Sequence, residues 1–406
     1  MRMLLKAGNV RLLSAILAVA LSLPVSLNLF SGFSVWLSPY ILLNSVLALR
    51  TFVGLNLVAI VVLAIALLRK RWFCRYLCPV GWGCDKISSL SHNKTSTYNR
   101  LPDFGKWIAL MSLSAALVGF PLFIILDPLA IFNGFFSVIS GKLSLIALLS
   151  LLGLPVLFLV HLFLPGIWCS KLCPLGGLQT MLGELTGRIL QIIPGRKRES
   201  VHYDSGRRYF MMAATGLLTG AVIPGILKPA DARSIRPPAA VEPLLFDTLC
   251  CRCGNCRKAC PTGIIVPCTD FNDILSMMTP EISFKSGYCL ETCNLCSKVC
   301  PTGAIMLFSV NAKSQLFMGS ASVNLEKCLL ANGKECVKCK ESCKYNAISF
   351  VTGENILQVN PVVDLAKCVG CGACEVICPA GCVTVTGYPV KGATAGGRQQ
   401  IGGAYK

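Results

Sequence analysis

Long apolar stretches alternate with short basic segments over the first half of the chain, and cysteine, glycine and charged residues replace them after about residue 227. Each apolar stretch approaches the roughly 20 residues that a helix needs to cross the hydrocarbon core of a membrane. The pattern therefore predicts a membrane part followed by a part outside the hydrocarbon. The five predicted spans are residues 12–30, 52–68, 107–126, 143–165 and 209–227.

Lysine and arginine residues differ between the two sides of this membrane part. The N-terminal tail carries three, the loop 69–106 eight and the segment 166–208 seven, whereas the loops 31–50 and 127–142 carry one each. This alternation follows the positive-inside rule and indicates a cytoplasmic N-terminus in a bacterial inner membrane. A fifth span then places the cysteine-rich part in the periplasm.

The start of the fifth span supports this orientation. Arg207-Arg208-Tyr209-Phe210 resembles a twin-arginine export signal, and Ala230-Asp231-Ala232 resembles a processing site. The basic flank of an ordinary anchor helix is the alternative, and it has the same topology. If the fifth segment does not cross, the cysteine-rich part stays in the cytoplasm. Four residues weaken this segment as a span: Gly216, Gly220, Pro224 and Gly225.

The membrane part contains one unit twice. Cys74-x3-Cys78-Pro79 follows the second span and Cys169-x3-Cys173-Pro174 follows the fourth. Upstream, Ser38-Pro39 and Asp127-Pro128 each place a capping side chain before proline, which predicts two short helix starts. We expect these short helices on the outer surface, with three aromatic side chains at the lipid headgroups: Trp36, Tyr40 and Phe132.

Folding the two repeats together would bring Cys74, Cys78, Cys169 and Cys173 into one four-thiolate site, with Cys84 as a substitute ligand. An iron–sulfur centre, a redox-active dithiol pair and packing cysteines at a tight turn are the alternatives. A stable disulfide does not suit the reducing side of the membrane. We expect most of the bilayer to separate this inner site from the cysteine-rich part.

Sixteen of the 24 cysteines form four quartets in that part. The bacterial ferredoxin run is Cys-x2-Cys-x2-Cys-x3-Cys-Pro, whose fourth cysteine ligates the neighbouring cluster. The first and fourth quartets match this run, the second has one extra residue, and the third has a long first gap. The spacing predicts four [4Fe-4S] clusters. The quartets are Cys250/Cys253/Cys256/Cys260, Cys289/Cys293/Cys296/Cys300, Cys328/Cys336/Cys339/Cys343 and Cys368/Cys371/Cys374/Cys378.

Disulfide bonds and zinc sites fit the cysteine spacing less well than iron–sulfur clusters do. Disulfide frameworks also use many cysteines, but runs of three-residue spacings put the thiols on one short loop. Zinc ribbons use pairs separated by longer gaps. Cys251, Cys268 and Cys382 fall outside the quartets, and we interpret them as spare or packing thiols.

Charge and histidine content exclude several classes of function. The part up to residue 227 has a formal charge of +14 and the rest +5. Four clusters with their thiolates would carry roughly −2 each, so the basic balance does not indicate nucleic acid. Only His161 lies in a predicted span, too few for a membrane b-type haem, and no Cys-x-x-Cys-His occurs for a c-type haem.

The motifs resemble those of a known family pair. Residues 1–190 resemble NapH-type membrane ferredoxin subunits in their four spans and paired Cys-x3-Cys-Pro motifs. Residues 205–385 resemble NapG/MauM-type periplasmic polyferredoxins in the arginine pair, the Ile235-Arg236-Pro237-Pro238 stretch and the long-gap third quartet. The chain departs from the NapH type because no cysteine lies between Cys173 and Cys250.

This resemblance implies a fused quinol dehydrogenase. Menaquinol or ubiquinol would be oxidised at the membrane, and the clusters would pass electrons to a periplasmic reductase or cytochrome, with other membrane subunits as further partners. His161 and Asp127 are the candidate proton acceptors, and we expect the quinol pocket near residues 38–48 and 128–138. The alternatives are a cytoplasm-facing ferredoxin in redox or cofactor maturation and a passive electron relay.

The expected fold is a membrane α-helical bundle, with four spans in two repeats and a fifth anchor helix, followed by an α+β tandem ferredoxin-like domain. The expected divisions are a membrane domain, a linker with the fifth segment, a four-cluster domain and a flexible tail. Their bounds are residues 1–190, 191–232, 233–390 and 391–406.

Overall fold

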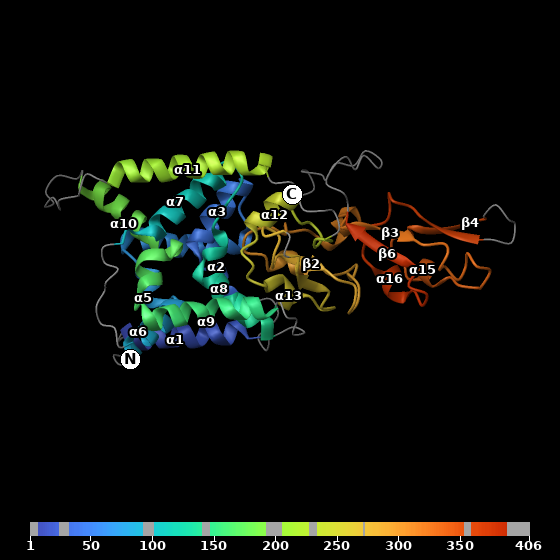
Figure 1. Cartoon of the computed structure of the whole chain (residues 1–406), viewed down its shortest axis with the longest axis horizontal. Coiled ribbons are helices and arrows are strands. Elements are labelled where there is room, and N and C mark those ends of the chain that lie inside the picture. The colour runs from blue at the N-terminus through green and yellow to red at the C-terminus, as the bar shows by residue number, and fades with distance from the viewer. Residues whose placement is uncertain are drawn as a thin grey trace. The chain divides into compact units, whose positions relative to one another are not determined.

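The structure, a computed structural model, forms two compact units (Figure 1). The helical unit comprises Met1–Lys228, Leu244–Lys258 and Pro301–Ala304, and the cluster unit comprises Pro229–Pro243, Ala259–Cys300 and Ile305–Lys406. The described residues are 7–23, 32–91, 101–139, 147–191, 205–226, 234–270, 273–352 and 359–387. The predicted processing site and the tail from residue 391 lie outside them.

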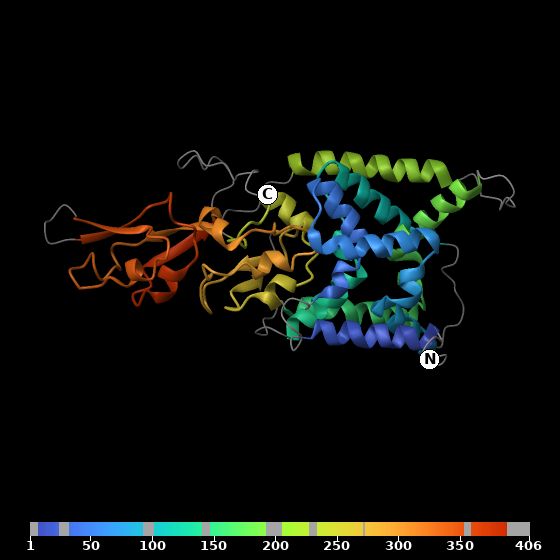
Figure 2. The same cartoon turned by 180° about the vertical axis from the view of Figure 1, so that it is seen from behind.

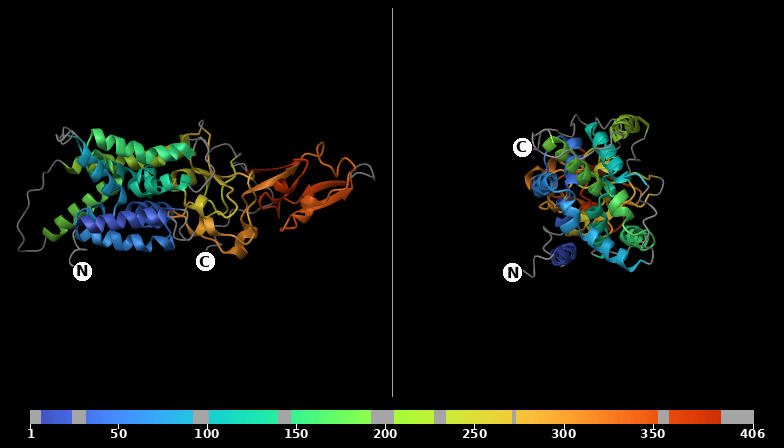
Figure 3. Two further views of the ribbon diagram at one scale, coloured as in Figure 1. Left: turned by 90° about the horizontal axis from the view of Figure 1, so that it is seen from below. Right: turned by 90° about the vertical axis from the view of Figure 1, so that its left-hand side faces the viewer.

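Each predicted span carries a helix, but most of these helices are short. The five are α1 (Ala7–Ser22), α4 (Leu57–Leu68), α7 (Phe104–Leu117), α9 (Ala147–Phe163) and α11 (Ser205–Ile226). Among the described residues, only Gly206–Ile226 is long and apolar enough to cross a membrane. The four-span bundle therefore stays a prediction. In Figures 1 and 3, the axes of α1, α9 and α11 are roughly parallel.

Short helices fill the space between them. They are α2 (Phe33–Trp36), α3 (Pro39–Leu49), η1 (Gly54–Asn56), α5 (Trp72–Tyr76), α6 (Pro79–Leu90), η3 (Ile124–Leu126), α8 (Pro128–Ile139), the π-helix η4 (Trp168–Leu172) and α10 (Pro174–Gln191). The predicted helix start at Ser38-Pro39 is confirmed, because the Ser38 hydroxyl accepts a hydrogen bond from the Ile41 N–H. Asp127 caps α8 in the same way.

The prediction that three aromatic side chains of this region lie at the lipid headgroups is wrong, whereas the side of the membrane on which α3 and α8 lie stays a prediction. Trp36, Tyr40 and Phe132 are buried in the helical unit, at 5%, 0% and 5% exposure. Tyr40, Phe132 and Leu129 of these helices belong to the core of the unit together with Phe73. Both helices are apolar on more than one face, and a helix of that kind is normally packed on all sides.

Glycines in α11 allow it to pack closely on α7. A Cβ on Gly216 would stand 2.0 Å from Ser114 Oγ, and one on Gly220 would stand 3.0 Å from Ala115 Cα. Small residues let helix backbones approach each other in this way. Gly216 and Gly220, two of the residues that weaken this segment as a span, therefore lie on its contact face, and the pair of helices is visible in Figures 1 and 2.

Among its described residues, the cluster unit has short helices and three two-stranded antiparallel sheets. β1 (Ile265–Pro267) pairs with β2 (Pro280–Ile282), β3 (Gly319–Val323) with β6 (Val383–Gly387), and β4 (Ile348–Thr352) with β5 (Val359–Val363). The remaining elements are α14 (Leu295–Lys298), η5 (Val310–Gln315), α15 (Lys338–Glu341) and α16 (Ala373–Ile377). In the helical unit, α12 (Pro243–Leu249) and α13 (Asn255–Ala259) flank the loop that carries Cys250 and Cys253, and Cys256 lies on α13.

Candidate metal centres

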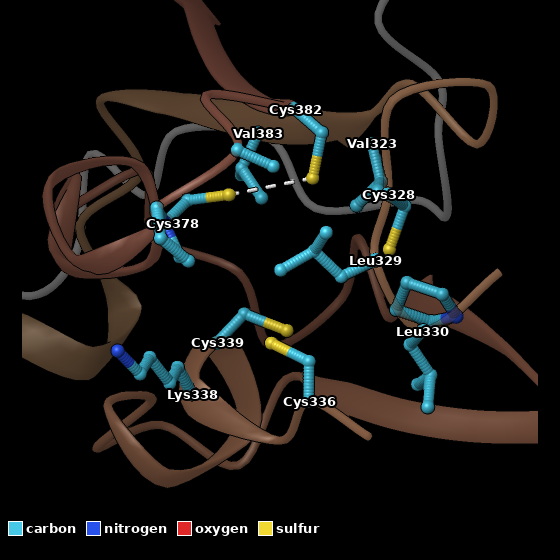
Figure 4. Close-up of a pocket in the computed structure, with 13 residues that line it drawn as sticks. Val323, Cys328, Leu329, Leu330, Cys336, Lys338, Cys339, Cys378, Cys382 and Val383 are labelled. Carbon is cyan, nitrogen blue, oxygen red and sulfur yellow. Dashed lines mark hydrogen bonds between the residues drawn. The ribbon is translucent and has the colours of Figure 1, made fainter. Parts of the chain in front are cut away.

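Five thiols line one cavity at the third quartet, as Figure 4 shows. Cys328, Cys336 and Cys339 come from the third quartet, and Cys378 comes from the fourth. The exchange of the fourth ligand, which is typical of ferredoxin runs, therefore joins these two quartets. The fifth thiol, Cys382, faces the same cavity.

The converse exchange forms a second cavity. Cys343, the fourth cysteine of the third quartet, lines it together with Cys368, Cys371 and Cys374. The Ala347 N–H donates to Cys343 Sγ at 3.2 Å. Four thiols on tight loops with a backbone donor to sulfur suit the ligand set of a [4Fe-4S] cluster.

Cys260, the last cysteine of the first quartet, lies near the thiols of the second quartet. Burial raises the pKa of the Cys289 and Cys296 thiols, and the nearby thiol of Cys260 raises both further. Cys260 therefore lies with the second quartet, and this set also includes Cys293. Bound iron would keep such thiols deprotonated in spite of their burial.

A buried lysine stands beside this second set. Lys313 is 2% exposed, and its ammonium donates to the carbonyl oxygens of Leu290 and Cys293. Its positive charge favours the thiolate form of Cys289, which lowers that pKa against the effect of burial. The sequence does not reveal this residue, because the lysine lies 20 residues beyond Cys293 and in no motif.

The second and fourth sites are neighbours in the cluster unit. The Cys289 N–H donates to the Cys371 carbonyl oxygen at 2.9 Å. Burial, followed by the charges of Cys371 and Cys289, raises the pKa of Tyr345. The phenol of Tyr345 is therefore neutral and lies close to both sets of thiols.

The first three cysteines of the first quartet are held by the helical unit. Asn133 in α8 is fully buried, and its amide donates to the Cys253 carbonyl oxygen at 2.7 Å and to Asn255 Oδ1 at 2.6 Å. Lys258 Nζ donates to Asn133 Oδ1 at 3.1 Å and to the Ser22 carbonyl oxygen at 2.9 Å. Buried polar groups with this many partners fix the loop in place.

The segment Pro301–Ala304 is held by the same unit. Asn56 donates to the Pro301 carbonyl oxygen at 2.6 Å. Gly303 has a φ of +71°, and a Cβ there would stand 2.8 Å from both Leu49 and Val53. The residues next to the fourth cysteine of the second quartet are thus anchored on the helical unit.

Inside the helical unit, the two repeats bring their cysteines together. Cys74, Cys78, Cys169 and Cys173 line one cavity of about 60 Å³. Cys78 caps α6 by accepting from the Gly81 N–H at 3.3 Å, and Cys173 caps α10 by accepting from the Gly176 N–H at 3.4 Å. A helix N-terminus favours the thiolate, which is the form that binds metal.

Ser38 and Asp127 occupy equivalent positions in the two repeats, and their side chains contact each other in the helical unit. The Ser38 hydroxyl donates to Asp127 Oδ2 at 2.5 Å, and both residues are buried. Pro128 lines the four-cysteine cavity. Asp127 is therefore buried inside the helical unit and is not exposed on a protein surface. Both of its carboxylate oxygens already accept hydrogen bonds.

The expectation that most of a bilayer separates the inner cysteines from the cysteine-rich part is wrong for the first quartet loop. Pro128 lines the inner cavity, and Asn133, five residues along α8, binds the first quartet loop at Cys253. Five residues of α-helix advance about 7.5 Å. One short helix thus connects the two places.

His161 lies next to the inner cysteines. Its Nδ1–H donates to the Leu157 carbonyl oxygen at 3.0 Å, and its buried Nε2 has no hydrogen-bond partner among the described residues. The donor atoms of His161, Cys84 and Cys169 lie within 4.8 Å of one another.

A large apolar cavity lies in the same unit. It measures about 660 Å³ and is bounded by α1, α6, α8 and α9. Residues 128–138 contribute Phe132, Phe135 and Phe136, whereas no residue of 38–48 lines it. Pro79, next to Cys78, also lines it, so the cavity reaches the edge of the inner cysteine site. Cavities of this size and character bind apolar small molecules.

Family comparisons agree with the cysteine sites. Two family models match, both described as a 4Fe-4S binding domain. One covers residues 51–97 and 146–193, which contain the two Cys-x3-Cys-Pro motifs, and the other covers residues 361–384. No solved structure matches the chain significantly.

Curated relatives match the C-terminal part. The methylamine utilization ferredoxin-type protein MauM of Paracoccus denitrificans is 30% identical over 185 residues, which are 44% of this chain and 81% of the relative. The ferredoxin-type protein NapG of Escherichia coli is 31% identical over 190 residues, 43% of this chain and 82% of the relative. The ferredoxin-type protein NapF of Haemophilus influenzae is 34% identical over 151 residues, 37% and 78% respectively.

Proposed function

This chain belongs to the family of iron–sulfur, ferredoxin-type electron-transfer proteins that includes MauM and NapG, and we propose that it is a membrane quinol dehydrogenase. In this proposal quinol binds in the apolar cavity, the inner cysteines receive its electrons, and the cluster unit delivers them to a periplasmic reductase or cytochrome. The basic loops of the membrane part support the periplasmic placement.

The observation that carries the proposal is the adjacency of the apolar cavity and the inner cysteines. Pro79 lines the cavity, and its neighbour Cys78 lines the four-cysteine site. A quinol ring and its isoprenoid tail are apolar, and the lining offers phenylalanine rings against which they can stack. Iron–sulfur clusters, held by the cysteine sets described above, would supply one-electron carriage.

Quinol oxidation releases two electrons and two protons, so the chain needs a proton acceptor near the cavity. Phe158 lines the cavity, and His161 lies three residues further on the same face of α9. The free Nε2 of His161 accepts one proton in our proposal, and the other passes to solvent. Asp127 does not have this role, because its oxygens are engaged in capping and in the bond to Ser38.

The route out of the inner site follows α8. Asn133 fixes the loop that carries Cys250, Cys253 and Cys256, only five residues from Pro128. No haem is needed between these places, since the helix holds both within the helical unit. In the proposal, electrons therefore pass along one series of cysteine sites from the membrane part outwards.

A cavity-filling variant tests the quinol site. Ala20 lines the cavity and is solvent-exposed, so Ala20→Phe should narrow the cavity without disturbing a core. We expect the rate at which a menaquinol analogue bleaches the cluster absorbance of anaerobic protein to fall about tenfold, roughly 1.4 kcal/mol of activation free energy. Leu17→Phe is the matched control, because Leu17 is an exposed residue of α1 outside the cavity lining. Equal rates in both variants and the unmodified chain would contradict this site.

A further inference from the structure

The third cluster site has one thiol more than a cubane needs. A [4Fe-4S] cluster takes one cysteine per iron, yet Cys328, Cys336, Cys339, Cys378 and Cys382 all line this cavity. The sulfur atoms of Cys378 and Cys382 are 3.3 Å apart, and Cys382 is 4% exposed. In Figure 4 these two thiols lie together on one side of the cavity, opposite Cys339 and Cys336.

A tight turn fixes this pair. Cys378 and Cys382 are separated by Pro379, Ala380 and Gly381, and the Gly381 N–H donates to the Cys378 carbonyl oxygen at 3.2 Å. Gly381 has a φ of +58°, a left-handed conformation that glycine adopts without strain. The Cys382 carbonyl oxygen accepts from the Asn324 N–H at 2.8 Å, so the backbone holds both sulfurs at the same corner.

The three other quartets have an apolar residue at the position of Cys382. The residue four places after the fourth cysteine is Ile264, Ala304 and Ala347 in the first, second and third quartets, and each is at most 2% exposed. The fold therefore needs only a buried apolar side chain there, and the cavity of the fourth quartet is lined by four thiols and no fifth. A cysteine at this place adds a sulfur donor that the turn itself does not require.

We propose that Cys382 is an alternative ligand for the iron that Cys378 binds, so that the third cluster has two exchangeable fourth ligands. In the exchange, one Fe–S bond to Cys378 breaks and one to Cys382 forms, while the proton of the Cys382 thiol moves to the Cys378 sulfur. The sulfur–sulfur contact of 3.3 Å allows this transfer directly. No electron enters or leaves, and no further reactant is required.

The inference requires that the third cluster site holds a cluster, and the test examines this premise separately. Full-length protein is purified without oxygen, and iron and acid-labile sulfide are counted in five forms: the unmodified chain, Cys378→Ala, Cys382→Ala, the double variant and Cys339→Ala. Cys339 has no spare thiol at its corner, so Cys339→Ala should lose about four irons and four sulfides per chain. If Cys339→Ala loses no iron or sulfide, the third cluster site holds no cluster and the premise itself fails.

With the cluster established, the two single variants decide the proposal. Cys378→Ala and Cys382→Ala should each keep the full iron and sulfide content, and the double variant should lose about four of each. The EPR spectrum of reduced Cys378→Ala should differ from that of the unmodified chain, because another thiolate binds the iron. Loss of four irons and sulfides in either single variant would overturn the inference, as would their retention in the double variant.

Discussion

At the residue scale, Lys313 shows how the protein can adjust a cluster with one buried charge. Its ammonium is 2% exposed and is bonded to the carbonyl oxygens of Leu290 and Cys293. A cation inside a low-dielectric site stabilises the more negative state of a nearby redox centre. The second cluster gains a negative charge on reduction, so Lys313 should make that reduction easier.

Lys313→Met should therefore make the reduction potential of the second cluster more negative. We expect a shift on the order of 60 mV, which is a tenfold change for a one-electron couple. Lys313→Arg keeps the charge and is the matched control. Redox titration followed by EPR measures both. A shift of equal size in the two variants would indicate repacking rather than charge.

The cysteine ligands were within reach of sequence reasoning, whereas Lys313 and Cys382 were not. Three of the thiols that bind a cluster must come from one tight loop, so their spacing is visible directly in the sequence. A buried lysine is recognised only when the loops that cover it are known. In the sequence Cys382 resembles a packing thiol, and only its position beside Cys378 in the cavity supports the proposed ligand role.

At the element scale, α8 is a connection between two sites. Its N-terminal Pro128 lines the inner cysteine cavity, and Asn133 binds the first quartet loop. Asn133→Leu would remove a hydrogen-bond partner from Asn255, from Lys258 and from the Cys253 carbonyl group. Losing partners of buried polar groups costs about 1–3 kcal/mol each.

We expect Asn133→Leu to release that loop, with loss of about four irons per chain and a fall in thermal stability. Asn44→Leu is the control, because Asn44 has the same offset from Ser38 that Asn133 has from Asp127 and is also fully buried. Its amide bonds Tyr40 and Ser112 instead. Iron analysis and thermal melts of both variants are the measurements. Full iron content in Asn133→Leu would show that α8 does not hold the first site.

The repeat and the starts of its helices could be predicted from the sequence, but the burial of α3 and α8 inside the helical unit could not. Ser38-Pro39 and Asp127-Pro128 specify where these helices begin. Hydropathy alone does not distinguish a short apolar helix on a surface from one inside a bundle. The burial of Tyr40 and Leu129 depends on neighbouring helices that are distant in the chain.

At the scale of the whole molecule, the contacts define an order of clusters that differs from the order of quartets. Cys260 joins the first quartet to the second, the Cys289–Cys371 backbone hydrogen bond joins the second to the fourth, and Cys378 joins the fourth to the third. Within the cluster unit, electrons at the second site would pass the fourth before they reach the third. In the proposed function, the third site is therefore the exit.

Removal of single clusters distinguishes this order from a sequential one. Cys339→Ala should remove the third cluster and leave the fourth reducible by quinol, since the second site feeds the fourth directly. A sequential order predicts the opposite, because the fourth cluster would then lie beyond the missing third. Cys374→Ala should remove the fourth cluster and leave the third unreduced by quinol but still reducible by dithionite. EPR of quinol-treated, anaerobic protein shows which clusters are reduced in each variant. Quinol reduction of the third cluster in Cys374→Ala would refute this order, because the route would then not need the fourth site.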